Sequence, residues 1–438
     1  MSVSFVSLIL PTHTTDIKVD DIDGDGQAEI VVVGKDNGTD VPSGISLYVY
    51  KEKGEQWEQI KKIKLGQKAI FWEVQKGVWG MDALGIRNLY ADSEEYLIRQ
   101  DTWLKGLRKA SPKEADFVHD LNDDGENEFL LNKDSSLYGF SAGNISWGQV
   151  SIPVVSSIRE YSKTGGAALE VAKRSAPVVV QDVDGDGIKD LIFLKSTQAE
   201  VHYSVNGMLG TKRIETIDLP INVEPQQERN VKKELSTVQF VDLNSDQKID
   251  MIWRYWITGE NRFGASSEIG WAFGHGSGFD EAQSFIQEQA IVDLQVSDVD
   301  SDGDQDLLLI GIDLGLGSLA AAMVSQSASV NLLQSRLDDR KFQNPQELSH
   351  FSFPIKLQDV LDYHGEIDIN DDGQKDIMVL LIDRYIEYYR NGDKLEEVRN
   401  EKLEVTGGNF YLGCLACERP AVVIWKKGSV QAQIFHVK

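Results

Sequence analysis

The chain has little cysteine, proline or histidine for its length, and each shortage narrows its class. Its 438 residues include 2 cysteines, 10 prolines and 7 histidines. Two cysteines cannot supply a disulfide framework, and one Cys-x-x-Cys pair alone cannot supply the four ligands of a structural zinc site. No run approaches the roughly 18–20 apolar residues of a membrane-spanning helix. The spacings typical of serine hydrolases, zinc proteases and P-loop proteins are also missing.

Positive charge is scarce as well. The chain carries 44 Lys and Arg against 70 Asp and Glu, which gives a net charge of −26. Nucleic acids and anionic membranes attract basic surfaces, so neither is an expected partner. The short basic stretch at 105–113 is interpreted as a solvated loop.

The acidic residues are concentrated in a nine-residue pattern, Asp-x-Asp/Asn-x-Asp-x-x-x-Asp/Glu, that occurs six times. Each copy leads directly into an apolar segment such as IVVV, LIFL or LLLI. Carboxylates this close repel one another, so we expect a cation to neutralise them. Side chains at positions one, three, five and nine, with the carbonyl of position seven, form a donor set that suits Ca²⁺ better than the strictly octahedral Mg²⁺.

We predict about five to six bound Ca²⁺ ions. The expected ligands are Asp21, Asp23, Asp25, Gln27 and Glu29; Asp120, Asn122, Asp124, Glu126 and Glu128; Asp182, Asp184, Asp186, Ile188 and Asp190; Asp242, Asn244, Asp246, Lys248 and Asp250; Asp298, Asp300, Asp302, Asp304 and Asp306; and Asp368, Asn370, Asp372, Gln374 and Asp376.

Two alternatives to this interpretation are an EF-hand and a solvated acidic turn without metal. The EF-hand needs a glutamate at position twelve and a helix on each side, whereas position twelve is apolar in all six copies and the flanks are β-branched or aromatic. We therefore expect each loop to join two strands, with a glycine at position six that takes a positive φ. Gln247 replaces this glycine in the copy that begins at Asp242, which should be the weakest or an empty site.

The spacing of the copies predicts the architecture. Their starts lie 56 to 99 residues apart. A degenerate copy at 82–89 divides the longest gap and gives seven units of about 63 residues. We expect an all-β, seven-bladed β-propeller with calcium-binding hairpin loops, which forms a single domain over 1–438. The segment 3–10 makes a poor signal peptide, because no Lys or Arg precedes it, and is expected to close the ring against 429–437.

These loops, each followed by a hydrophobic strand and repeated at about 60 residues, resemble the FG-GAP or VCBS repeats of integrin α-like β-propellers. The name-giving part of the motif has only near-matches, Phe273-Gly274 and Gly278-Phe279. The resemblance covers essentially the whole chain and implies a seven-bladed, calcium-binding propeller. It implies no single activity, so function is expected in the surface loops. Because such sites suit extracellular calcium levels, the predicted location is extracellular, cell-surface or periplasmic.

Three stretches exceed what a four-stranded blade needs and are the predicted interaction loops: 66–116, 253–279 and 312–357. Their aromatic residues suit a protein partner or a sugar, or they pack inside blades. Periodicity leaves 312–357 open between a helical insertion and two strands. The pair Cys414 and Cys417 is open between a local disulfide, free thiols and a catalytic pair.

The favoured function is a non-catalytic scaffold for protein binding or adhesion. A carbohydrate-binding propeller is the first alternative. A polysaccharide lyase is the second, and its only dense set of candidate residues is Arg254, Tyr255, Arg262 and His275.

Overall fold

The computed structural model describes most of the chain. The described residues are 6–11, 14–35, 45–54, 56–65, 69–82, 84–91, 95–99, 113–114, 117–133, 135–163, 166–221, 226–228, 231–259, 265–275, 278–312, 327–354, 362–369, 372, 374–380, 384–391, 394–403, 409–413, 421–426 and 429–436.

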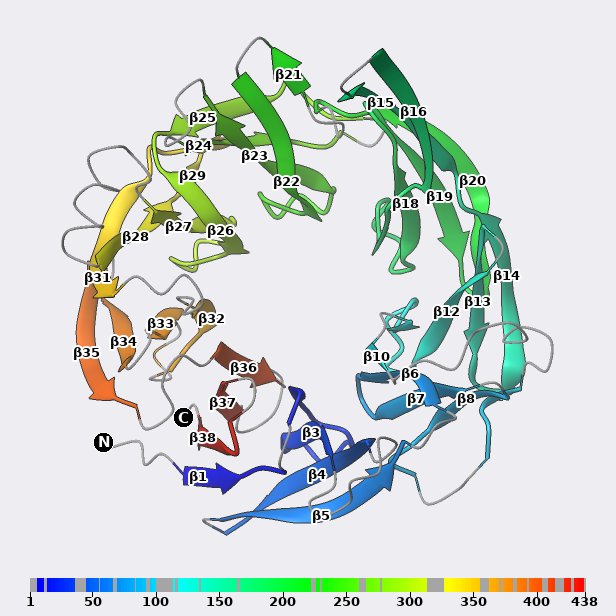
Figure 1. Cartoon of the computed structure of the whole chain (residues 1–438), viewed down its shortest axis with the longest axis vertical. Coiled ribbons are helices and arrows are strands. Elements are labelled where there is room, and N and C mark those ends of the chain that lie inside the picture. The colour runs from blue at the N-terminus through cyan, green and yellow to red at the C-terminus, as the bar shows by residue number, and fades with distance from the viewer. Residues whose placement is uncertain are drawn as a thin grey trace.

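Eight sheets of four or five strands stand in a ring around a central axis, as Figure 1 shows. This arrangement is a β-propeller, and each sheet is one blade. Neighbouring strands within a blade are antiparallel, except for a short parallel pairing of β10 with β6. The predicted all-β propeller is confirmed.

The blades follow the chain in order. Blade 1 contains β2 (Asp16–Asp20), β3 (Glu29–Lys35), β4 (Ile45–Lys53) and β5 (Gln56–Lys64); blade 2 contains β6 (Ala69–Val74), β7 (Val78–Asp82), β8 (Gly85–Asn88), β9 (Ile98–Arg99) and β10 (Lys113–Glu114); blade 3 contains β11 (Val118–His119), β12 (Glu128–Lys133), β13 (Ser136–Ser141) and β14 (Ile145–Ser151), with the 3₁₀ turn η1 (Ala142–Asn144); blade 4 contains β17 (Val178–Gln181), β18 (Asp190–Leu194), β19 (Gln198–Val205) and β20 (Met208–Asp218). Blade 5 contains β21 (Gln226–Glu228), β22 (Val231–Val241), β23 (Asp250–Thr258), β24 (Ala265–Ala272) and β25 (Gln283–Gln287); blade 6 contains β26 (Ala290–Ser297), β27 (Asp306–Ile312), β28 (Ser327–Ser335) and β31 (Gln346–Pro354), beside the small hairpin β29 (Leu337–Asp338) and β30 (Lys341–Phe342); blade 7 contains β32 (Asp362–Ile367), β33 (Asp376–Leu380), β34 (Arg384–Asn391) and β35 (Lys394–Lys402); blade 8 contains β36 (Asn409–Gly413), β37 (Ala421–Trp425), β38 (Gln431–His436) and β1 (Val6–Ile9).

The prediction of seven blades is wrong. It counted copies of the acidic pattern, and the eighth blade has no copy. Its fourth strand comes from the other end of the chain: β1 pairs antiparallel with β38, with Val6 opposite Ile434 and Ile9 opposite Gln431. Leu8 packs in one buried cluster with Ile17 of blade 1 and Trp425 of blade 8. The predicted closure of the ring by the N-terminal segment is therefore confirmed.

The six acidic stretches each connect two strands of one blade, as predicted. They are numbered after their blades: loop 1 (21–29), loop 3 (120–128), loop 4 (182–190), loop 5 (242–250), loop 6 (298–306) and loop 7 (368–376). The degenerate copy at 82–89 was placed in the wrong hairpin, because it falls between the second and third strands of its blade. The equivalent connection in blade 2 is the short turn at 75–77, between β6 and β7.

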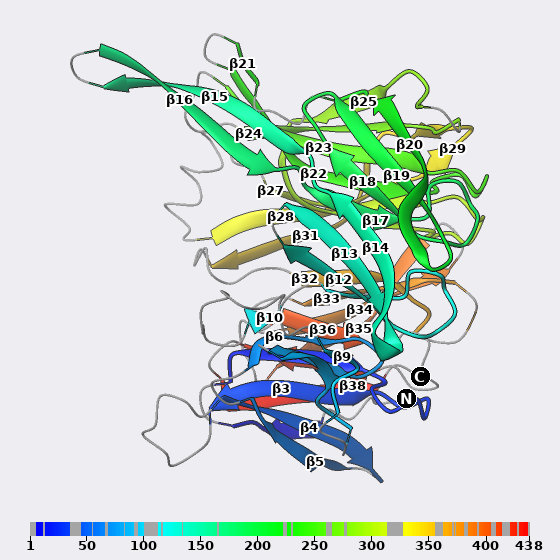
Figure 2. The same cartoon turned by 90° about the vertical axis from the view of Figure 1, so that its right-hand side faces the viewer.

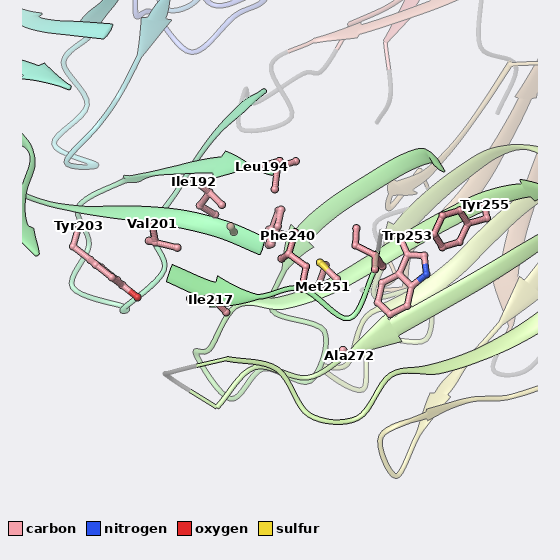
Figure 3. Close-up of a cluster of buried hydrophobic side chains, with 13 residues drawn as sticks. Ile192, Leu194, Val201, Tyr203, Ile217, Phe240, Met251, Trp253, Tyr255 and Ala272 are labelled. Atoms are coloured by element: carbon pink, nitrogen blue, oxygen red, sulfur yellow. The ribbon is translucent and has the colours of Figure 1, made fainter. Parts of the chain in front are cut away.

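The core lies between blades. The strand that follows each acidic loop has neighbours on both faces, so it is mostly apolar after its first residue, as in the fully buried Asp190–Leu194. Figure 3 shows the cluster between blades 4 and 5, where Ile192 and Val201 meet Phe240 and Trp253. Burying each such side chain contributes roughly 1.5–3 kcal/mol, so every blade is stabilised by the next.

One element stands outside the ring. The hairpin β15 (Val154–Lys163) and β16 (Gly166–Ser175) forms a separate two-stranded sheet with ten residues in each strand. Figure 2 shows it projecting from the body of the propeller beside β21. Repeat counting did not predict it. Within the described residues there is also no helix with the length and apolar character to cross a membrane.

Candidate functional site

The acidic loops share a hydrogen-bond pattern that uses the backbone. The carboxylate at position one accepts the N–H of position six, as Asp182 does from Gly187 at 2.8 Å; the distances in loops 1, 3, 4, 5 and 6 run from 2.7 to 3.2 Å. The carboxylate at position five accepts the N–H of position seven in all six loops, at 2.8 to 3.0 Å. Backbone dipoles therefore offset part of the repulsion that the sequence suggested only a metal could relieve.

Two residues in each of loops 1, 3, 4, 5 and 6 have a positive φ. At position six the prediction is confirmed, with φ of 84° at Gly26, 81° at Gly187 and 64° at Gln247. Position four was missed: Gly24 has φ of 76° and Ser245 of 54°. Loop 5 thus holds two non-glycine residues in the left-handed region, a strained arrangement that the Gly-x-Gly copies avoid.

The carboxylate at position nine is buried and ties the loop to the rest of its blade. In Asp250, which is 0% exposed, Oδ2 accepts the N–H of Leu243 at 2.8 Å and Oδ1 accepts the N–H of Gly274 at 2.7 Å. Gly274 belongs to the Phe-Gly pair noted in the sequence, and a Cβ there would lie 2.2 Å from the carbonyl oxygen of Ile249. The sequence analysis assigned position nine to a metal and missed this structural role.

Burial shifts the titration of these position-nine groups. Desolvation outweighs the backbone hydrogen bonds and raises each pKa: to about 7 for Glu29, Glu128 and Asp306, and to about 6 for Asp190 and Asp250. Neighbouring loop carboxylates raise them further. Without another cation, therefore, the folded loops disfavour the ionised state.

The carboxylate at position three forms ion pairs with basic side chains from other strands. In loop 1, the Lys51 Nζ of β4 lies 2.8 Å from Asp23 Oδ2, 2.7 Å from Asp25 Oδ2 and 2.7 Å from Glu29 Oε1. Burial alone would lower the pKa of Lys51, but its three acidic partners raise it, so the ammonium stays charged. In loop 4, the Lys212 Nζ of β20 lies 2.8 Å from Asp184 Oδ2.

Carboxylate oxygens converge in three of the loops. One oxygen from each residue lies within 4.8 Å of the others in three sets, which are Asp21, Asp23 and Glu29 of loop 1, Asp182, Asp184 and Asp190 of loop 4, and Asp298, Asp300 and Asp302 of loop 6. Arg336 Nη1 approaches Asp300 Oδ2 at 3.4 Å. Yet the Oδ1 atoms of Asp298 and Asp300 are buried and have no hydrogen-bond partner among the described residues. This donor set fits a hard divalent cation such as Ca²⁺.

The asparagine-bearing copies arrange their carboxylates differently. Asn122 of loop 3 donates from Nδ2 to Asp124 Oδ2 at 2.8 Å, and Lys76 of blade 2 reaches Asp120 at 3.2 Å. In loop 5, Lys248 pairs with Asp246 of the same loop at 3.3 Å. Asn370 of loop 7 lies outside the described residues, as do Cys414 and Cys417.

The three predicted interaction loops are mostly strands of blades, so their prediction as loops is wrong. Residues 66–116 include all of blade 2, whose Trp72 and Trp79 are buried. Residues 253–279 contain most of β23 and all of β24, and residues 312–357 contain β28 and β31, which favours the two-strand alternative for the described part of that stretch. Trp103 and residues 313–326 lie outside the described part of the chain.

Among the described residues, those considered for a lyase do not come together. Arg254 and Tyr255 are consecutive in β23 and so face opposite sides of the sheet. Arg254 is buried and donates from Nε to Ser236 Oγ at 2.8 Å, while Tyr255 packs in the cluster of Figure 3. His275 lies past the end of β24, near the acidic loop, and Arg262 is outside the described residues.

A pocket of about 270 Å³ opens between blades 4 and 5. Ile192, Ile217 and Phe240 line its interior, and Arg213 and Lys248 add positive charge. Its aliphatic lining suits an apolar group more than the polar edge of a sugar. A carbohydrate-binding propeller would be favoured by repeated polar pockets between blades, and this pocket does not have that character.

The face opposite the acidic loops carries exposed apolar side chains. We call it the far face; it lies where β23 ends and β26 begins. Trp256 is 43% exposed there and donates from Nε1 to the Ile291 carbonyl at 3.2 Å, which places it at the seam between blades 5 and 6 beside the exposed Val292. Both ends of the β15–β16 hairpin also join the ring on this side, next to the end of β14 and the start of β17.

Comparisons with known proteins show similarity at the level of coordinates alone. No family model matches the sequence, and no curated protein matches it. The structure is similar to BBS1N, solved in complex with ARL6DN and soaked with lead (TM-score 0.39, 10% identity, 100% of this chain and 98% of that chain), and to the Dos1 propeller (0.44, 10%, 98% and 93%). It is also similar to the V. cholerae biofilm matrix protein Bap1 (0.31, 10%, 99% and 89%). Likenesses this distant assign no family, so the FG-GAP or VCBS relationship stays a prediction.

Proposed function

We propose that this chain is a non-catalytic scaffold that binds another protein through its far face. The observation that carries the proposal is Trp256, a large aromatic side chain held half-exposed at a blade seam with its ring nitrogen already satisfied. Tryptophan anchors of this kind dominate the energy of protein interfaces. The projecting β15–β16 hairpin adds two strands next to this surface.

The test compares a variant in the far face with a control variant at an exposed residue elsewhere. Trp256→Ala is compared with Ile214→Ala, since Ile214 is 63% exposed but lies on the outer strand β20 of blade 4. A partner identified by proximity labelling is purified and titrated against both variants. We expect Trp256→Ala to weaken Kd by about 30-fold or more, the effect of losing an interface hot spot, and Ile214→Ala to leave it unchanged. Equal affinities for wild type and Trp256→Ala would refute the far-face site.

We also propose that Ca²⁺ binds in loop 6, because its buried oxygens fit the ion. Calcium there would neutralise three converging carboxylates and stabilise the β26–β27 connection. Asp300→Ala should remove one calcium from the stoichiometry measured by calorimetry after EDTA treatment. An unchanged stoichiometry would contradict calcium at this loop. The predicted adhesion role and extracellular, cell-surface or periplasmic location depend on such calcium and are part of this proposal.

A further inference from the structure

The lysine in loop 1 occupies the position at which a metal ion would bind. Lys51 lies on β4, the third strand of blade 1, and its side chain is only 16% exposed. Its Nζ contacts carboxylate oxygens from positions three, five and nine of the loop, all at 2.7 to 2.8 Å. These are three of the positions that the calcium interpretation requires.

The remaining carboxylate of loop 1 is already engaged. Asp21 Oδ1 accepts the N–H groups of Gly24 and Asp25 at 2.7 and 3.2 Å, and Oδ2 accepts that of Gly26 at 2.9 Å. Calcium would need oxygens at about 2.3–2.6 Å, in the space that the ammonium fills. A divalent ion beside it would also meet strong like-charge repulsion. Loop 1 therefore does not fit a resident metal while Lys51 is in place.

Loop 4 repeats the arrangement with a lysine from a different strand. Lys212 lies on β20, the fourth strand of blade 4, and contacts Asp184 at 2.8 Å and Asp186 at 2.5 Å. The two lysines are thus supplied from non-equivalent places in their blades yet reach the same loop positions, three and five. Because lysines from two different strands make the same contact, the contact of an ammonium group with positions three and five is the feature that these two loops share.

We infer that Lys51 and Lys212 are built-in cations that replace the metal ion in loops 1 and 4. Three of the six acidic loops then fall into two classes: loops 1 and 4 are neutralised by the chain itself and hold their shape without divalent ions. Loop 6, with buried carboxylate oxygens left over, depends on an ion from solution. The inference is independent of the far-face proposal.

The test counts ions in variants that remove either the lysine or a loop ligand. Lys51→Met keeps most of the apolar stem and removes the ammonium. Lys53→Met is the matched control, because Lys53 lies two residues further along β4 and pairs with Glu58 at the surface, 58% exposed. Asp23→Ala removes a ligand oxygen from the same loop with the lysine retained. Calcium stoichiometry is measured by equilibrium dialysis on protein whose near-ultraviolet circular dichroism matches wild type.

We expect Lys51→Met to bind one more calcium per chain than wild type, and to have a lower Tm in EDTA that added calcium restores. Lys53→Met and Asp23→Ala should bind the same number of ions as wild type. Loss of one ion in Asp23→Ala would overturn the inference, since it would show metal in loop 1 beside the lysine. An unchanged ion count in Lys51→Met would overturn it as well.

Discussion

Replacing Asp250 with alanine should destabilise the propeller whether or not calcium is present. Asp250 ends loop 5, the copy least suited to metal because of Asn244 and Gln247. Its two oxygens accept buried N–H groups from Leu243 and Gly274 at 2.8 and 2.7 Å. The variant leaves both donors without an acceptor in a place that water does not reach.

The magnitude follows from these two bonds. A hydrogen bond to a charged acceptor contributes about 1.5–3 kcal/mol, so two lost bonds set an upper limit near 3–6 kcal/mol. Part of that is offset because the variant no longer buries a carboxylate whose pKa is raised to about 6 by desolvation. We expect a net loss of about 2–4 kcal/mol in the free energy of unfolding.

The assay is urea denaturation followed by circular dichroism, in EDTA and in excess calcium. The control is Asp246→Ala in the same loop, an exposed carboxylate whose removal should cost less than about 1 kcal/mol. A loss below about 0.5 kcal/mol for Asp250→Ala would refute the structural role of position nine. A loss seen only in calcium would show that the residue acts as a metal ligand instead.

Three further predictions concern the ring, the blade cores and the pH response. Leu8→Ala should lower the free energy of unfolding by about 2–5 kcal/mol, because it loosens the strand that closes the ring. Ile9→Ala is the control, since Ile9 is 76% exposed and its loss should cost less than about 0.5 kcal/mol. Thermal unfolding measures both, and equal effects would contradict closure through β1. Gly270→Ala places a Cβ 2.4 Å from the buried Trp253 ring and should cost about 1–3 kcal/mol in urea denaturation, whereas Gly259→Ala, with no atom within 4 Å, should be neutral or slightly stabilising. In EDTA, stability measured by urea midpoints should fall as pH rises from about 4.5 to 7, because the folded state then holds protons that the unfolded chain has released; a flat or rising profile would argue against it. The groups responsible are Glu29, Glu128, Asp190, Asp250 and Asp306.

Local patterns in the sequence were sufficient for the loops and for the strands that follow them. The DGDG copies carry glycine where φ is positive, and runs such as LIFL are apolar because both faces are buried. The eighth blade was missed because its strands come from opposite ends of the chain and the sequence between β36 and β37 has no copy of the acidic pattern. Counting acidic loops therefore counts only the blades that carry one.

The cations were missed for a different reason. Lys51 and Lys53 stand in the same short run of β4 and look alike as letters, yet one is enclosed by carboxylates and the other is solvated. Only the register of β4 against β3 decides which lysine reaches the loop. The role of Gly274 was likewise invisible, because its N–H meets a carboxylate 24 residues earlier in the chain.

The antiparallel pairing of β1 with β38 has a mechanical consequence. Val6 lies opposite Ile434, so the free ends of the two strands leave the sheet at the same edge. A force that pulls the two chain ends apart would load the backbone hydrogen bonds one after another, as a zipper opens, and not all at once in shear. Under tension the ring should therefore open first between β1 and β38, while the covalent links between the other blades keep them in sequence and allow the ring to close again when the force is released.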